Sequence, residues 1–182
     1  MLELGGRIGD GVIAGTGLLP EIIRDTITRV HTAAREAGRN PADVDIWFTT
    51  RTSLHEDREK ALDNVKASVS SILNHSMRQG LDNKHVPNDL RAKIQQYVDG
   101  YVLYDHVLHE GQNPKRMGEL GLTEYAIRRF ALAGNSGDWI ARIEELASAG
   151  ATKLWIGPVG GHLDSQLHYM RILGEQIMSR FG

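Results

Sequence analysis

Short apolar segments that end in glycine-containing loops alternate with amphipathic helical segments along most of this chain, and this alternation constrains the fold most strongly. The first apolar segment, residues 10–14, precedes the loop Gly15-Thr16-Gly17, and apolar residues then recur every three or four positions up to Gly38. Strands that alternate with helices at this spacing predict parallel βα units, whose ligands bind at the carboxyl ends of the strands. The sequence therefore predicts an α/β fold.

The same pattern returns three more times. Further strands are predicted at residues 44–50, 130–133 and 153–157, and further helices follow them at about 56–77, 135–147 and 164–180. Trp47 and Trp155 occupy strand positions, which favours burial in the core over a role as stacking platforms. Residues 81–129 interrupt the alternation with polar and short helical stretches and predict a helical excursion without a core of its own, so residues 1–182 are expected to form a single domain.

Composition excludes several classes of function. The 182 residues carry a formal charge of −2, and no cluster of Lys and Arg indicates a nucleic-acid surface. Cysteine is absent, which excludes disulfides, thiolate metal sites and a cysteine nucleophile. No apolar run approaches the ~18 residues of a membrane span, and the first residues lack the pattern of a signal peptide. A cytoplasmic protein is therefore expected.

Four stretches, in the same order as in the family, resemble the luciferase-like monooxygenases, which group flavin-dependent monooxygenases with deazaflavin-dependent reductases. They are LGGRIGDGVI at 4–13, AAREAGRNPADVD at 33–45, the unit from AGNS at 133–136 through LASAGA at 146–151, and WIGP at 155–158 with LGEQI at 173–177. Within the family, the last stretch is most similar to the methylenetetrahydromethanopterin reductase branch. The resemblance covers nearly the whole chain but only the last third to half of a family member.

The resemblance implies that the chain is the C-terminal part of a (β/α)8 TIM barrel, with three or four parallel βα units. It also implies an oxidoreductase, either a monooxygenase or a hydride-transfer reductase, with FMN or an 8-hydroxy-5-deazaflavin coenzyme as cofactor and a small molecule as substrate. Because five βα units of the barrel would be missing, the chain is expected to form a homo-oligomer or to be completed by another chain, and to be inactive alone.

The sequence is also compatible with two other functions. One is a non-catalytic barrel fragment, a subunit or scaffold that pairs with a partner chain and binds no flavin. The other is a different phosphate-binding barrel enzyme, because a fold alone does not determine chemistry.

The candidates for cofactor binding lie at the predicted carboxyl ends of the strands. Backbone N–H groups at a helix start attract anions, and a guanidinium can bind a phosphate or carboxylate through two hydrogen bonds. The candidates are Gly15, Thr16 and Gly17 after the first strand, Arg51 just past the second, and Gly157, Gly160, Gly161 and His162 after the last. Each has a structural alternative, since the glycines can serve tight turns and Arg51 can be a solvated loop residue.

No catalytic residue can be assigned from the sequence, which shows no serine triad, nucleophile elbow or carboxylate pair. Asp105-His106 and His109-Glu110 place two imidazoles three residues apart beside two carboxylates. This spacing is not that of a known zinc motif, and surface residues are favoured over a ligand set. No metal site is therefore predicted.

Overall fold

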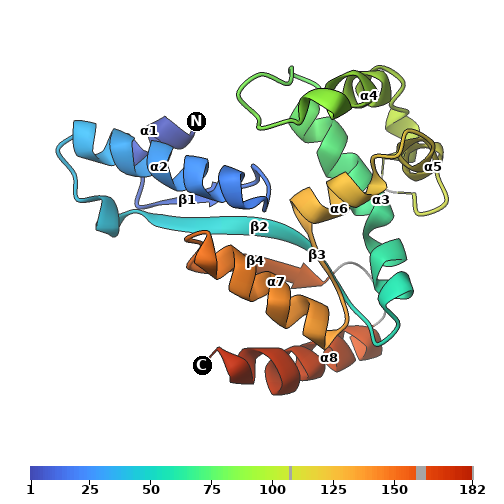
Figure 1. Ribbon diagram of the computed structural model, residues 1–182. Helices are drawn as coiled ribbons and strands as arrows, with labels where there is room; N and C mark the ends of the chain where they lie inside the picture. The colour runs from blue at the N-terminus through green and yellow to red at the C-terminus, as the bar shows by residue number, and fades with distance from the viewer. Residues whose placement is uncertain (107, 159–162, 182) are drawn as a thin grey trace. The chain divides into compact units, whose positions relative to one another are not determined.

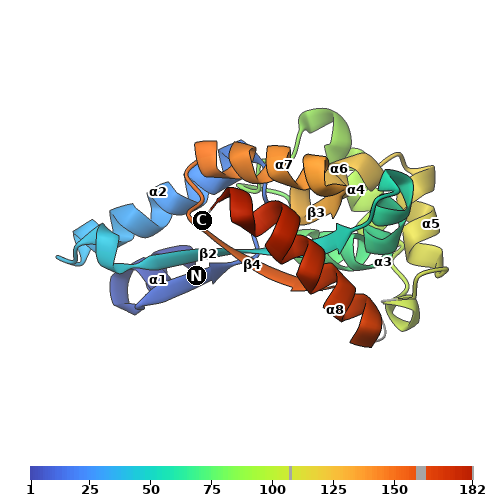
Figure 2. The ribbon, with the colours of Figure 1, turned by 90° about the horizontal axis from the view of Figure 1, so that it is seen from below.

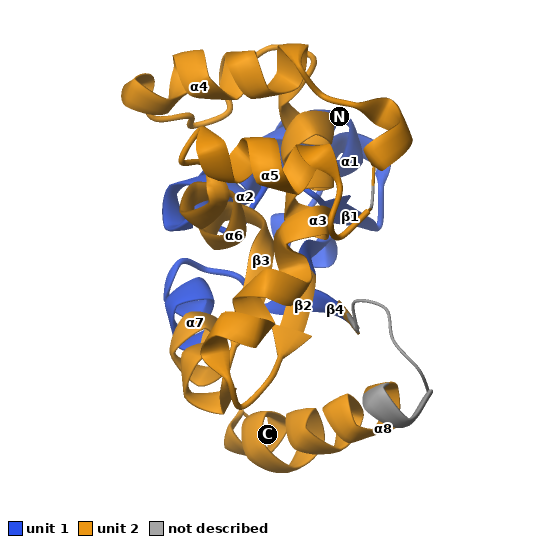
Figure 3. Cartoon of the chain, turned by 90° about the vertical axis from the view of Figure 1, so that its right-hand side faces the viewer, with its two compact units in different colours: residues 1–50, 144–156 blue, residues 51–143, 157–182 orange. Residues whose placement is uncertain are grey.

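The computed structural model describes residues 1–106, 108–158 and 163–181 and forms two compact units (Figure 3). The first unit contains residues 1–50 and 144–156, and the second contains residues 51–143 and 157–182. Each unit has a hydrophobic core of its own.

The first unit is a small parallel sheet with helices on one face. Its elements in chain order are α1 (Leu2–Ile8), β1 (Gly11–Ala14), α2 (Pro20–Glu36), a 3-10 turn at Pro41–Asp43 and the first half of β2 (Asp45–Leu54), followed later by most of β4 (Lys153–Pro158). β1 pairs in parallel with β2, with Gly11 opposite Asp45 and Ala14 opposite Phe48. β4 also pairs with β2, and Figure 1 shows β1 and β4 on opposite sides of that strand.

The helix-facing side of this sheet is closely packed. Ile46 and Phe48 of β2 are buried, and they share a core with Ile23 and Val30 of α2 and Leu146 of α7. Figure 2 shows α2 running alongside β2. From Asp45 to Thr50, buried residues of β2 alternate with more exposed ones, as expected of a strand with one covered face.

The opposite side of the same sheet is open. Ile13 is 60% exposed, Trp155 53% and Trp47 39%. The expectation that both tryptophans are buried in the core is not met among the described residues, because each is more than a third exposed. Parallel sheets normally have both faces covered, so the open face is unusual.

α1 approaches α2 so closely that a glycine is needed at the crossing. A Cβ atom built on Gly6 would lie 2.3 Å from the carbonyl oxygen of Val30, closer than real atoms come. Ion pairs join the same two helices, including Arg29 to Glu3 at 2.5 Å and Arg7 to Glu36 at 3.0 Å. The glycine-rich stretch that begins the chain is therefore a packed helix.

The second unit is mainly helical. In chain order it contains the second half of β2, α3 (Arg58–Met77), α4 (Asn88–Asp99), a 3-10 turn at Leu103–Asp105, α5 (Gln112–Glu119), α6 (Thr123–Phe130), β3 (Ala131–Gly134), the start of α7 (Ser136–Ser148) and α8 (Leu163–Ile172), which continues through short turns at Leu173–Ile177 and Met178–Arg180. Figure 2 shows α8 and these turns as one continuous rod.

The helical excursion at 81–129 shares a substantial core with α3, which lies earlier in the chain. Ile94, Tyr97, Met117 and Leu122 are fully buried against α3, which contributes Leu73. The excursion therefore packs on a helix outside it, and the expectation that it has no core of its own stays a prediction.

The strand order departs from that of consecutive barrel units. β3 pairs in parallel with the end of β2, with Arg51 opposite Ala131 and Leu54 opposite Gly134. β4 pairs with β2 rather than with β3, although a barrel built in chain order would place β4 next to β3. Parallel βα units are therefore present, whereas their assignment as part of a barrel remains a proposal. No described helix is long and apolar enough to span a membrane.

Candidate functional site

The loop after β1 is held by internal contacts. Gly17 has a φ of +122°, a conformation that favours glycine, and the hydroxyl oxygens of Thr16 and Thr26 lie 3.0 Å apart. No side chain caps the start of α2, where Pro20 lacks an N–H group and Glu21 adds a negative charge. The loop therefore offers few donors to an anion beyond its backbone.

Arg51 lies within β2, not just past it. The strand extends to Leu54, because its last four residues pair with β3. Arg51 is exposed, while Thr52 beside it is buried. Arg51 therefore lies on a paired strand, which fixes its backbone more firmly than a loop would.

Gly157 lies in a small hydrogen-bonded network at the carboxyl end of β4. The hydroxyl of Thr52 donates to the carbonyl oxygen of Gly157, and the hydroxyl of Tyr169 donates to Thr52 Oγ1 at 3.3 Å. Burial raises the pKa of Tyr169, so this phenol keeps its proton. A Cβ atom built on Gly157 would meet no atom of the described residues within 4 Å, so these residues leave space beside its backbone.

The predicted cofactor residues are thus divided between the two units. Gly15, Thr16 and Gly17 belong to the first unit, and Arg51 and Gly157 belong to the second. Gly160, Gly161 and His162 lie outside the described residues. Their convergence on one cofactor therefore remains a prediction.

Comparison with known proteins decides the family. The sequence model of the luciferase-like monooxygenases matches residues 1–153. The chain belongs to this family. Among its relatives are two 5,10-methylenetetrahydromethanopterin reductases, one from Methanopyrus kandleri, 24% identical over the whole chain and 48% of the relative, and one from Methanolobus tindarius, 25% identical over 98% of the chain and 50% of the relative.

Solved structures give the same fold. The coenzyme F420-dependent tetrahydromethanopterin reductase from Methanopyrus kandleri matches all of this chain and 48% of its own, with a TM-score of 0.74 and 24% identity. An F420-dependent secondary alcohol dehydrogenase matches 97% of this chain and 44% of its own, with a TM-score of 0.61 and 16% identity. This luciferase-like chain spans about half the length of the relatives it matches.

A charged cleft in the second unit was not foreseen from the sequence. It has a volume of about 570 Å³ and is lined by α3, α6, β3 and α7. Arg58 Nε lies 3.6 Å from Asp138 Oδ1, and the buried Arg142 donates to the carbonyl oxygen of Arg128 at 2.7 Å. The basic lining residues are Arg58, Lys66, Arg128 and Arg142, and the acidic ones are Glu59, Glu124 and Asp138. This near balance of charge favours ion pairing within the cleft over capture of a highly charged ligand. The residues come from three separated helices, so no local pattern could have indicated the cleft.

Two histidines of the excursion, His106 and His109, contact polar side chains. His106 Nε2 lies 3.0 Å from the hydroxyl of Ser71, and its Nδ1 lies 2.9 Å from that of Tyr101. His109 Nε2 lies 3.3 Å from Asp63, whose pKa is lowered mainly by a hydrogen bond from Lys66. In the part of the luciferase-like chain that the structure describes, no three His, Cys, Asp or Glu residues form a group suited to a metal ion.

Proposed function

We propose that this chain forms part of a deazaflavin-dependent oxidoreductase that transfers a hydride to or from a small-molecule substrate. The proposal rests on the family match over residues 1–153, together with relatives that are named as coenzyme F420-dependent enzymes. One of them is the F420-dependent glucose-6-phosphate dehydrogenase from Mycolicibacterium gilvum, 30% identical over 63% of this chain. These names favour a deazaflavin over FMN.

The described residues fit part of such a cofactor. The described residues leave space beside the Gly157 backbone, and the side chain of the exposed residue Arg51 suits a phosphate or carboxylate on the cofactor tail. A bound deazaflavin would supply the ring that carries the hydride, while the protein supplies binding and orientation. Thr52 and Tyr169 would position the Gly157 backbone, since their hydroxyls form the network that holds it.

The chain is proposed to be the C-terminal part of a barrel and to need the remaining units for turnover. A productive site must hold donor and acceptor in reacting geometry, which takes residues from several strand ends. The purified 182-residue chain alone is therefore expected to show no turnover with deazaflavin or FMN.

A fluorescence titration tests the cofactor proposal. The chain is titrated with the deazaflavin and with FMN, alone and mixed with the part of the Methanopyrus kandleri reductase that lies outside the match. Losing a charge-assisted hydrogen bond costs about 1.5–3 kcal/mol, so Arg51→Ala is expected to weaken deazaflavin binding roughly ten- to a hundredfold. Arg91→Ala, which removes an arginine from α4, is the control and should leave the dissociation constant unchanged. Equal constants for Arg51→Ala and the unmodified chain would remove Arg51 from the site.

A second candidate function is a scaffold that pairs with a partner and binds no flavin. The pairing of the Thr16 hydroxyl with Thr26 favours it, because that hydroxyl already has a partner inside the protein. The acidic Glu21 in the first turn of α2 also opposes an anion at this loop. Absence of fluorescence changes with both cofactors, in the mixture as well as in the chain alone, would support the scaffold.

A further inference from the structure

The charged cleft of the second unit has no part in the proposed function. Its volume of about 570 Å³ lies within the range of small-molecule sites, and none of its described lining residues is a predicted cofactor residue. Ala131 and Ala133 lie two positions apart on β3, so they line the cleft from one face of the strand. Leu62 of α3 and Ile127 of α6 add larger apolar side chains. The cleft therefore offers apolar contacts as well as charged ones.

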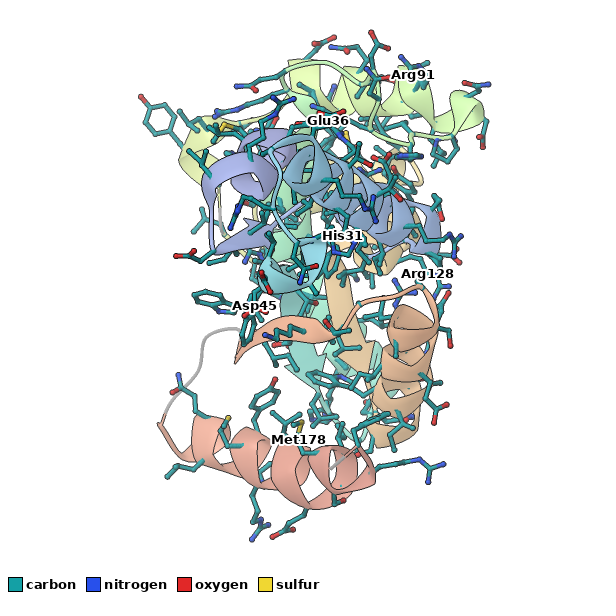
Figure 4. The ribbon with its side chains drawn as sticks, turned by 90° about the vertical axis from the view of Figure 1, so that its left-hand side faces the viewer. His31, Glu36, Asp45, Arg91, Arg128 and Met178 are labelled. Carbon is teal, nitrogen blue, oxygen red and sulfur yellow. The ribbon has the colours of Figure 1, made fainter. Side chains whose placement is uncertain are left out.

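A buried guanidinium lines this cleft. Arg142 of α7 is only 9% exposed, and its Nη2 donates to the carbonyl oxygen of Arg128 at 2.7 Å. Arg128, which Figure 4 labels, belongs to α6, so this hydrogen bond joins two of the helices that line the cleft. A charge with little water around it attracts an anion more strongly than a solvated charge does. Arg142 therefore favours a carboxylate on the ligand.

Glu124, in the first turn of α6, supplies the opposite charge. Other charged groups of the lining already have partners, since Arg58 Nε lies 3.6 Å from Asp138 Oδ1 and Lys66 Nζ lies 2.8 Å from Asp63 Oδ1. Within the described part of the chain, Glu124 forms no hydrogen bond or ion pair, and it is exposed at the cleft. This carboxylate therefore favours a cationic group on the ligand.

We propose that this cleft binds a small zwitterion with an apolar body, either an amino acid or a short peptide, with its carboxylate at Arg142 and its ammonium group at Glu124. Such a ligand satisfies both charges and places its apolar part against the alanines of β3. A phosphate or another multiply charged anion is disfavoured, because Glu59, Glu124 and Asp138 would repel it. The proposal does not depend on the cofactor, whose candidate residues lie elsewhere.

Calorimetric titration of the 182-residue chain with four probes tests the proposal. L-Leucine and L-leucyl-L-leucine carry both charges and distinguish an amino acid from a peptide as the ligand. N-acetyl-L-leucine lacks the ammonium group, and L-leucinamide lacks the carboxylate. We expect one of the two zwitterions to bind about three- to tenfold more tightly than either singly charged probe, because each missing charge removes one ion pair.

Two charge variants assign the ends of the ligand. Glu124→Gln should weaken binding of the zwitterion about three- to tenfold and leave binding of N-acetyl-L-leucine unchanged. Arg142→Lys keeps the charge but loses the planar fork, so it should weaken binding of every probe with a carboxylate about tenfold and leave L-leucinamide unchanged. Glu119→Gln removes the same charge from α5, outside the described lining of the cleft, and should change no dissociation constant.

A third variant fills the cleft without changing its charge. Ala133 is only partly buried, and Ala133→Leu places a larger side chain in the space that the ligand's apolar body would occupy. Binding of all four probes should be lost, while the circular dichroism spectrum stays that of the unmodified chain. Glu124 is exposed, so Glu124→Gln keeps the test decisive if either of the other two variants fails to fold.

Three results would overturn the proposal. The first is the absence of binding by both zwitterions at concentrations up to about 10 mM. The second is binding that neither Ala133→Leu nor Glu124→Gln weakens, because the ligand would then lie outside the cleft. The third is displacement of a bound zwitterion by the deazaflavin, which would assign the cleft to the cofactor site. Zwitterion binding that the deazaflavin leaves unchanged supports a separate site.

Discussion

The two cores of this chain differ in how completely they are enclosed. In the second unit, helices α3, α4, α5 and α6 and strand β3 surround their buried residues from several directions, and Leu73, Ile94 and Met117 are fully buried. In the first unit, the helices cover one face of the sheet and leave Trp47 and Trp155 open on the other. Helices can close a core among themselves, whereas a parallel sheet needs cover on both faces.

The difference indicates where the chain depends on something beyond itself. The second unit has an enclosed core, as expected of a fold that is stable by itself. In the first unit, the described helices pack on one face of the sheet, and residues on the other face are exposed.

Trp139 and Trp47 give the sharpest contrast. Trp139 is fully buried in the second unit, donates to the carbonyl oxygen of Ser53 at 3.0 Å and stacks edge-on against Tyr169. Trp139→Ala should lower the free energy of unfolding by about 3–5 kcal/mol, the usual cost of emptying such a site. Trp47→Ala should cost about 1 kcal/mol, well below the Trp139 value, because the Trp47 side chain is 39% exposed in the folded chain. Urea unfolding followed by circular dichroism measures both, and equal losses would show that the open face is covered in solution.

A substitution at Gly6 tests how closely α1 packs against α2 in the first unit. Gly6→Ala places a methyl group against the Val30 carbonyl and should cost about 1–3 kcal/mol by forcing α1 away from α2. Gly174→Ala is the matched control in the second unit, since its Cβ would meet nothing within 4 Å and alanine favours helix by up to about 1 kcal/mol. The test is a comparison of the two urea midpoints. An unchanged urea midpoint for Gly6→Ala would mean that α1 is not held against α2.

Tyr97, in the core of the second unit, should make the free energy of unfolding depend on pH under alkaline conditions. Its hydroxyl donates to the Ser70 carbonyl oxygen at 2.8 Å, and burial raises its pKa above the ordinary value of 10.0. The unfolded chain therefore loses this proton first, so the free energy of unfolding should fall as the pH rises above about 10. Tyr97→Phe should cost about 0.5–1.5 kcal/mol at neutral pH and flatten the decline between pH 9 and 11. An unchanged pH profile would assign the decline to other groups, such as Tyr101 and Tyr169, whose pKa values burial also raises.

A substitution of Asp63 should change the stability of the folded chain least. Its pKa is lowered mainly by the hydrogen bond from Lys66, so the pairing stabilises the folded chain at neutral pH and is lost as the pH falls below about 3.8. Both side chains are 40–48% exposed, and such pairs contribute about 0.2–1 kcal/mol. Asp63→Asn should lose that amount at pH 7 in thermal unfolding, against Glu119→Gln as a control on α5. A loss above about 2 kcal/mol would contradict a surface pair.

The sequence predicted the elements well because their periodicity is local. The strands at 44–50 and 153–157 and the helices around them correspond to β2, β4, α3 and α8, and the family resemblance is confirmed by the match over residues 1–153. The end of β2 was missed because residues 51–54 are strand only through pairing with β3, which follows about 80 positions later. No local signal reports such a partner.

The site was less predictable than the fold. Arg51 was placed in a loop for the same reason that β2 was cut short, and the cleft at Arg58 and Arg142 depends on helices that meet only in three dimensions. The exposure of Trp47 and Trp155 was missed because strand tryptophans in an α/β pattern are ordinarily buried, and the sequence does not state what covers a sheet.

The two segments of the first unit, residues 1–50 and 144–156, are separated in the sequence by residues 51–143 of the second unit. Residues 51–143 come between the two segments of the first unit, so the last part of that unit leaves the ribosome only after all the helices from α3 to α6. Closing so long a loop is slow when the intervening residues are unstructured, because the chain must give up conformational entropy before the ends meet. Folding of the helical segment first would shorten that search. The order of synthesis thus allows the strand at 153–156 to join the sheet that carries Trp47 only after the helices from α3 to α6 have been made, and α8 follows later still.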